Sequence, residues 1–88
     1  MALEGMDVAQ VTSLANLMKQ KAAEIQGIIS TLSGQLSNTQ WVGADRNQFE
    51  GDWHGTYTQQ LTAVVNGLND AGNRAMQNVN QQTQASAT

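Results

Sequence analysis

Cysteine and proline are absent from the 88 residues of this chain, and histidine occurs once, as His54. Without cysteine, the chain can form neither a disulfide nor a thiolate metal site, and its composition leaves the redox compartment open. One histidine makes a zinc site only when several carboxylates surround it, so we expect no metal and no other cofactor.

Basic residues are also scarce: they are Lys19, Lys21, Arg46 and Arg74, and the formal net charge is −3. They form no basic cluster, so we expect no nucleic-acid binding. The first ten residues, MALEGMDVAQ, lack the charged and apolar regions of a cleaved signal peptide. No apolar run approaches the roughly 20 residues of a membrane span. On these absences alone, the default expectation is a soluble cytoplasmic protein.

The first half of the chain carries a heptad pattern. From residue 7 to residue 37, apolar side chains recur at alternating spacings of three and four. This pattern predicts one long helix with an apolar seam, a row of side chains that faces another helix. Asp7 and Gln10 resemble a capping box at the start of this helix. The predicted seam consists of Val8, Val11, Ala15, Met18, Ala22, Ile25, Ile29, Leu32 and Leu36.

The second half, from residue 44 to residue 82, predicts another long helix with a less regular seam. Its first apolar residues are spaced four apart, a local departure from the heptad that should alter the supercoil. Asp45 lies in the first turn, where a carboxylate interacts favourably with the helix dipole. Residues 83–88 lack apolar periodicity and predict a disordered tail. The predicted seam runs through Phe49, Trp53, Tyr57, Leu61, Val64, Leu68, Ala71 and Ala75, flanked by Val65, Met76 and Val79.

The short connection at residues 38–43 makes the two helices antiparallel neighbours, so residues 1–82 form one helical hairpin. Additional apolar residues beside the first seam, Leu14, Leu17 and Ile28, make the apolar surface wider than one hairpin can bury. We therefore expect an all-α fold in which two hairpins dimerise into a four-helix bundle. The hairpin and dimer core is predicted to include Val11, Met18, Ile25, Ile29, Leu32, Leu36, Phe49, Trp53, Leu61, Val64 and Leu68.

No constellation of polar residues indicates catalysis, so we expect no enzymatic activity. His54 and Glu50 have the spacing of a hydrogen-bonded pair, but both are also typical of a solvated helix face. Gly51 and Gly55 are spaced to permit close approach of a neighbouring helix, although the spacing could also be incidental. An amphipathic helix can lie on a membrane, but this use favours a basic polar face, which the first helix lacks.

The bend contains the tripeptide WVG, with a large apolar residue at Trp41 and a flexible one at Gly43. Gly43 can adopt a positive φ, or cap the second helix, where the chain reverses. Trp41 can fold over the end of the bundle and cover its last apolar layer, with the indole N–H toward water. A purely structural role for this motif and a role in recognition both remain open at this point.

A small, cysteine-free helical hairpin with Trp-x-Gly in its bend resembles the WXG family, the early secretory antigenic target-like substrates of type VII secretion systems. The resemblance extends beyond the tripeptide, because WVGADRNQFEGDW also has an apolar residue, Phe49, and an aromatic residue, Trp53, at the positions typical of members. It covers essentially residues 1–80.

The resemblance implies a virulence-associated, non-enzymatic protein that is made in the bacterial cytoplasm and secreted as a folded dimer without a cleaved signal peptide. It implies two partners: the type VII secretion ATPase, and either a second copy or a WXG-like partner chain. Trp41 and Gly43 would belong to the bend that the secretion machinery recognises.

The chain departs from the family in one respect, because it lacks the C-terminal Tyr-x-x-x-Asp/Glu export motif of many members. Its tyrosine, Tyr57, lies in mid-helix and is followed four residues later by Leu61. The source of the export signal is therefore open. Two alternative functions also remain at the level of sequence, namely a secreted effector that perturbs membranes and an intracellular helical scaffold.

Overall fold

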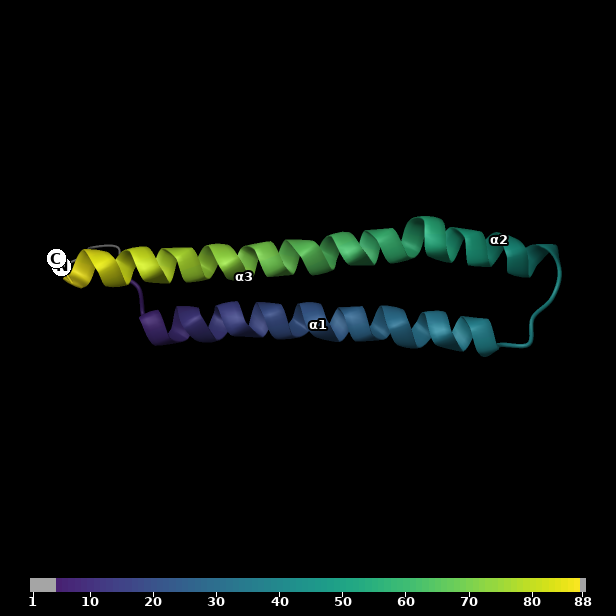
Figure 1. Ribbon diagram of the computed structural model, residues 1–88, viewed down its shortest axis with the longest axis horizontal. Coiled ribbons are helices and arrows are strands. Elements are labelled where there is room, and N and C mark those ends of the chain that lie inside the picture. Colours follow the sequence, from purple (N-terminus) through teal and green to yellow (C-terminus); the bar gives the residue numbers. More distant parts are fainter. Residues whose placement is uncertain (1–4, 88) are drawn as a thin grey trace.

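The computed structural model describes residues 5–87, and the described residues contain helices and no strand. Helix α1 spans Val8–Asn38, and the chain then reverses into α2, Ala44–Asp52. A single π-helical turn, η1, covers Trp53–Tyr57 and leads without a break into α3, Thr58–Ala87. Figure 1 shows that α2, η1 and α3 form one rod that runs antiparallel to α1. The predicted all-α hairpin is thus confirmed.

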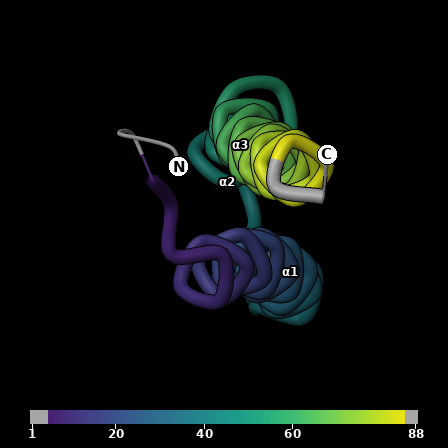
Figure 2. The backbone as a smooth tube through the Cα atoms, turned by 90° about the vertical axis from the view of Figure 1, so that its left-hand side faces the viewer, coloured from purple at the N-terminus to yellow at the C-terminus, as the bar shows by residue number. Residues whose placement is uncertain are grey.

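The hairpin is two helices wide and one layer thick, with extents of 66 × 17 × 15 Å (Figures 1 and 2). Its radius of gyration is 19.6 Å, whereas a compact domain of this length has about 12 Å. Its accessible surface is 6343 Å², compared with about 5,000 Å² for a compact monomer of this mass. An isolated hairpin therefore leaves an unusually large area in contact with solvent.

Local polar contacts define the two ends of α1. The Asp7 carboxylate accepts a hydrogen bond of 3.0 Å from the backbone N–H of Gln10, which caps the start of the helix. At the other end, the Thr39 hydroxyl donates to the Gln35 carbonyl at 2.6 Å, and the Thr39 N–H donates to the Leu36 carbonyl at 3.2 Å. These contacts satisfy carbonyls that no further helical turn can reach.

The face of α1 toward α3 follows the predicted seam for three heptads and then leaves it. Ala15, Ala22 and Ile29 are buried, and Leu36 is half-buried near the bend. Between the last two, Ser33 takes the position that the pattern predicts for Leu32, and Leu32 is 47% exposed. A straight helix drifts by about 20° per heptad relative to a strict repeat of seven, so the seam moves by one residue toward the bend.

The π turn sets the register of the second helix. In η1 the Thr58 N–H donates to the Trp53 carbonyl, five residues back, which adds one residue to that turn. The row that starts at Trp53 therefore continues through Thr58, the predicted Leu61 and then Val65. Thr58 and Val65 take the places predicted for Tyr57 and Val64. Val65 is buried at 8% exposure and Val64 is 50% exposed, so the predicted order of these neighbours is wrong.

The two helices approach each other closely at Gly72. A Cβ atom placed on this residue would lie 3.0 Å from the Ala15 carbonyl oxygen and 3.1 Å from Lys19 Cγ. Gly51 and Gly55, which the spacing suggests for such a role, have no atom within 4 Å of the corresponding position within the chain. Gly72 therefore serves this purpose within the hairpin, because a glycine opposite Ala15 lets the two backbones approach.

The second helix also extends further than the sequence pattern indicates. α3 continues to Ala87, whereas the pattern predicts its end near residue 82 and a disordered segment at 83–88. Gln and Ala are good helix formers, and no Gly or Pro interrupts residues 73–87, so nothing in this stretch ends the helix. Residues 1–4 of the predicted hairpin and Thr88 of the predicted tail lie outside the described residues.

Candidate interaction site at the bend

Gly43 supplies the backbone geometry that reverses the chain. Its φ is +117° and its ψ −174°, a conformation that residues with a side chain rarely adopt. It also occupies the N-cap position of α2, where its carbonyl accepts a hydrogen bond of 3.1 Å from the Asn47 N–H. Both roles expected of Gly43, the positive φ and the cap, are found together.

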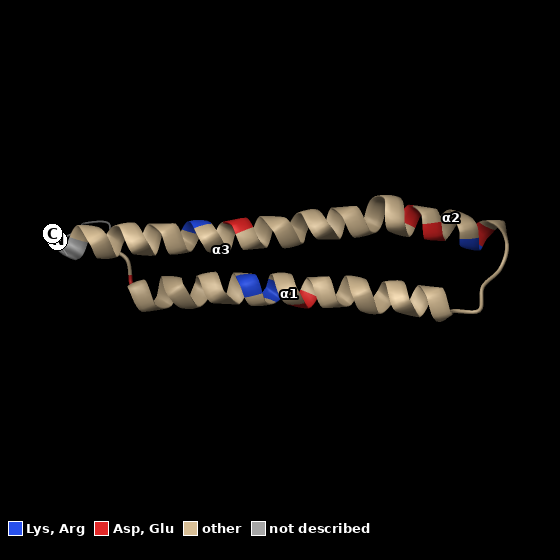
Figure 3. Cartoon of the chain, viewed as in Figure 1, with Lys and Arg blue, Asp and Glu red and all other residues tan. Residues whose placement is uncertain are grey.

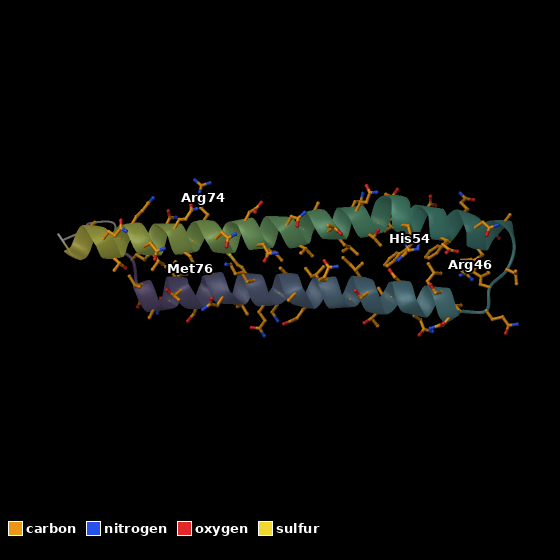
Figure 4. All side chains as sticks on the ribbon, in the orientation of Figure 1. Arg46, His54, Arg74 and Met76 are labelled. Carbon is orange, nitrogen blue, oxygen red and sulfur yellow. The ribbon has the colours of Figure 1, made fainter. Side chains whose placement is uncertain are left out.

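Arg46, in the first turn of α2, forms hydrogen bonds with the backbone of the bend. Its Nη1 donates to the Trp41 carbonyl at 2.8 Å and to the Thr39 carbonyl at 3.2 Å, and its Nε donates to Glu50 Oε2 at 3.1 Å. The Arg46 side chain is only 16% exposed, and Figure 4 shows it beside the bend. One guanidinium thus satisfies two loop carbonyls and a carboxylate, which fixes the backbone on both sides of residue 40.

Trp41 packs on Phe49 across the start of α2. The ring centroids are 5.3 Å apart and the ring planes make an angle of 45°, a favourable tilted arrangement. Trp41 remains 37% exposed and Phe49 remains 41% exposed, while Val42 between the bend residues is 90% exposed. Trp41 and Phe49 therefore form an aromatic pair at this end, and much of the pair faces solvent.

Trp53 connects the start of η1 to α1. Its indole Nε1 donates a hydrogen bond of 2.9 Å to the Ser33 hydroxyl, so the half-buried ring has its polar atom paired. Ser33 lies in the seam where Leu32 is expected, and this bond is the physical reason that a polar residue is tolerated there. The π turn and this hydrogen bond together fix how the second helix begins to follow α1.

An apolar hollow of about 210 Å³ opens next to these contacts, lined by Leu32, Leu36, Phe49 and Trp53. Leu32 also lines a shallow groove along α1, together with Glu24, Gly27, Ile28 and Thr31. The hollow and the groove thus form one continuous apolar surface from the bend to the middle of α1. Such a surface can receive the apolar side chains of another helix.

Chemistry-bearing side chains are not gathered at this site. His54 is exposed, as expected for a solvated helix face, and Glu50, whose spacing allows a pair with His54, is paired with Arg46. Within the described part of the chain, no group of three or more His, Cys, Asp or Glu side chains could hold a metal ion. Among the described helices, none is both long and apolar enough to cross a membrane. The arrangement is suited to contact with another macromolecule through its apolar surface.

The predicted core residues fall into two groups. A first group lies along the contact between the helices and is buried or half-buried, namely Val11, Met18, Ile25, Ile29, Leu36, Trp53, Leu61 and Leu68. Leu32, Phe49 and Val64 lie on the outside of the single hairpin. Sequence reasoning missed Ser33 and Arg46. The spacing of Arg46 and Glu50, four residues apart at a helix start, was the available signal for the latter.

Comparisons with known proteins place no further constraint on this site, since no family model, curated protein or solved structure matches the chain.

Proposed function

We propose that this chain is a non-enzymatic substrate and adaptor of a type VII secretion system, exported as a folded dimer in the manner of WXG proteins. The observation that carries the proposal is the bend, where Trp41 and Gly43 of the tripeptide lie at the reversal of a helical hairpin. Gly43 holds the positive φ of +117°, and Trp41 is 37% exposed beside it. An ordered bend with an accessible indole is a surface that an export machine can recognise.

The order of the bend supports a role beyond packing. Arg46 holds the Trp41 and Thr39 carbonyls, and Phe49 supports the Trp41 ring from beneath. A pre-organised aromatic side chain loses little conformational entropy when a partner binds it, which favours its use as an anchor. The exposed Val42 next to it extends the apolar contact area.

The described part of α3 does not contain the Tyr-x-x-x-Asp/Glu export motif of many WXG proteins. Tyr57 is exposed on η1 and Asp70 is the last acidic residue, so the C-terminal half of α3 offers no Tyr-x-x-x-Asp/Glu sequence. In this proposal the signal lies in the bend of the dimer or on a co-exported chain. The absence of the motif is thus a reason to test the bend directly.

Export should be measured in the native host and in a strain that lacks the type VII ATPase. We expect the chain in the culture supernatant of the first strain alone, at unchanged intracellular levels in both. Trp41→Ala should lower export at least several-fold while circular dichroism retains the helical signal. Asn66→Ala, which alters an exposed residue of α3 that lies far from the bend and outside the predicted core, is the matched control. Equal amounts in both supernatants would overturn the proposal.

A further inference from the structure

The second helix contains one residue more than a continuous heptad needs. At its start, the Trp53 indole donates its hydrogen bond of 2.9 Å to Ser33 on α1. Between this contact and Gly72, the row that faces α1 passes through Thr58 and Val65, each one residue later than an unbroken heptad would place it. The π turn η1 holds the added residue, because the Thr58 N–H donates to the carbonyl five residues back instead of four.

Local contacts, and not packing against α1, hold this turn. Where hydrogen bonds over five residues give way to bonds over four, one carbonyl loses its helical N–H partner. The Thr58 hydroxyl supplies a donor at this point, because it donates to the His54 carbonyl at 3.1 Å. Gly55 lies within the turn, where a residue without a side chain adopts non-α geometry at the lowest cost. Residues 54–57 are all exposed, so no core contact fixes the added residue in η1.

Two adjacent rows of side chains along this part of the helix can each face α1. In the observed row, Thr58 is half-buried and Val65 is 8% exposed. The residue before each of them is also suited to a helix contact, yet Tyr57 is 46% exposed and Val64 is 50% exposed. Leu61 is half-buried and lies at the border of both rows. The sequence thus encodes a second row, one residue earlier, that the π turn turns toward solvent.

A second place for the added residue lies at Gly67. This glycine is exposed and has no atom within 4 Å of a Cβ position, so packing within the hairpin does not require it. It lies between Val64 and Gly72, the stretch where a π turn would return the early row to the contact at Gly72. Figure 3 shows no charged side chain between Asp52 and Asp70, so rotation of this segment would place no charge against α1.

We propose that η1 is a register switch, in which the added residue moves between η1 and the stretch around Gly67 while the contacts at Trp53 and Gly72 are kept. The segment between the two places turns about the helix axis by one residue, or about 100°. This rotation carries Tyr57 and Val64 toward α1 and the residue that follows each of them toward solvent. The switch therefore sets whether an aromatic and an aliphatic side chain are exposed in the middle of the second helix.

The two registers bury similar side chains, which is the condition for exchange between them. At one level of the hairpin a valine replaces a valine, Val64 for Val65. At the other level Tyr57 replaces Thr58, so the second register exchanges a short polar side chain for a larger aromatic one. Both registers keep the fixed contacts at either end of the segment. Packed elements with two discrete arrangements of this kind shift as a unit on the microsecond to millisecond timescale.

The chain contains one tyrosine, so a fluorotyrosine label reports on Tyr57 alone. Fluorine NMR of the purified, labelled chain separates an exposed ring from one that packs on α1. We expect one major resonance of an exposed ring, with relaxation dispersion caused by exchange with the second register. A minor register at about 0.1–10% of the population lies within the range of this measurement.

Two single-residue deletions lock the two registers in chains of equal length. Deletion of Gly55 removes the added residue from η1, so that Thr58 follows Trp53 by four residues and the observed row continues in an unbroken α-helix. Deletion of Asn66 removes the added residue from the other place, so that an unbroken helix from Trp53 carries Val64 toward α1. We expect the exchange to be lost in both. The Tyr57 resonance should match the major state in the first and the minor state in the second.

Deletion of Ala23, an exposed residue of α1, is the matched control. Helix α1 has no π turn to shorten, so this deletion should lower the melting temperature more than deletion of Gly55 does. An Ala23 deletion that is tolerated as well would overturn the inference, since the hairpin would then accept any register.

Three further outcomes would overturn the inference. They are the absence of relaxation dispersion at Tyr57 in the full chain, unchanged dispersion after deletion of Gly55, and an exposed Tyr57 ring after deletion of Asn66. Loss of the helical circular dichroism signal on deletion of Asn66 alone would do the same, because the second register would then not be a folded state. The inference goes beyond the proposed function and does not rest on it. A hairpin that switches yet is not exported would retain the switch and remove the export proposal.

Discussion

The two ends of this hairpin are held together by different kinds of contact. One end is the bend, and the other is the open end, where α1 begins and α3 ends. Toward the open end, small residues bring the backbones together, with Gly72 opposite Ala15 and with Ala22 and Val79 buried nearby. At the bend, large aromatic residues lie between the helices or beside the loop, and hydrogen bonds hold the structure in place. The Trp53 indole donates a hydrogen bond to Ser33, and the Arg46 guanidinium donates one to the Trp41 carbonyl in the loop. Small residues form the closest contacts between the helices toward the open end, whereas at the bend the aromatic residues Trp41 and Phe49 remain partly exposed.

This difference indicates how structural and recognition roles are divided along the chain. The open half stabilises the hairpin through close contact and requires no polar side chain at its centre. The bend half relies on hydrogen bonds that keep aromatic side chains in one position while they face solvent. Substitutions that act on one half and have a matched control can therefore separate the two modes of stabilisation.

The largest loss is expected from a cavity where the two halves meet, at Ile29. Ile29→Ala removes a side chain that is 8% exposed, and should lower the free energy of unfolding by about 2–5 kcal/mol. Ile28→Ala is the control, because Ile28 is 51% exposed in the hairpin. Its effect should appear as a stronger dependence of the melting temperature on protein concentration. Equal losses of unfolding free energy in the two variants, at a protein concentration that saturates dimerisation, would contradict the prediction. They would show that Ile29 stabilises the hairpin no more than Ile28 does.

A substitution at Gly72, where the helices approach closely in the open half, should have the next largest effect on stability. Gly72→Leu places a Cβ 3.0 Å from the Ala15 carbonyl oxygen and must push the helices apart, at a cost of about 1–3 kcal/mol. Gly34→Leu meets no atom within 4 Å, and should gain up to about 1 kcal/mol from helix propensity. Thermal melts of the two variants should therefore shift in opposite directions. If Gly72→Leu were more stable than the unsubstituted chain, close packing at Gly72 would not be what stabilises the open half.

Backbone strain provides the corresponding test of the bend. Gly43→Val forces a β-branched residue into a φ of +117°, which should cost roughly 1–2 kcal/mol in denaturant unfolding. Val42→Ala changes a residue that is 90% exposed and should have almost no effect on stability. An unchanged denaturation midpoint for Gly43→Val would mean that the bend can adopt another conformation without loss.

Sequence reasoning predicted the hairpin and most of its seam because both depend on the period of apolar residues. It placed the bend correctly, together with the positive φ of Gly43, because glycine in a tight reversal has a specific conformational use. It missed the exchange of Val64 and Val65, because this depends on the π turn at residues 53–57, and a heptad pattern contains no signal for one added residue. It also missed Ser33, whose burial depends on a hydrogen bond from Trp53, twenty residues away in sequence.

Loss of the Arg46 hydrogen bonds to the loop should lower the free energy of unfolding by less than the backbone strain of Gly43→Val does. Arg46→Met keeps the aliphatic length but loses the bonds to two carbonyls and to Glu50, and should cost about 1 kcal/mol. Glu50 is 42% exposed, so its ion pair contributes little of this. Arg74→Met is the control on the outer surface of α3. In a Trp53→Phe background, the emission of Trp41 should shift to the red in Arg46→Met alone, as the loop opens to water.

The smallest effect is expected at the open end, beyond the last buried seam residue, Val79. Residues 83–85 are exposed, and Gln82 is the last half-buried residue among those of α3 whose side chains are described. Removal of residues 83–88 deletes helical turns whose described side chains contact solvent, so the free energy of unfolding should change by less than about 0.5 kcal/mol. By contrast, Val79→Ala removes two methyl groups from a site that is 5% exposed, and should cost about 1–2 kcal/mol. If the truncated chain melted as early as Val79→Ala, the end of α3 would have to make stabilising contacts, and the open half would extend beyond Val79.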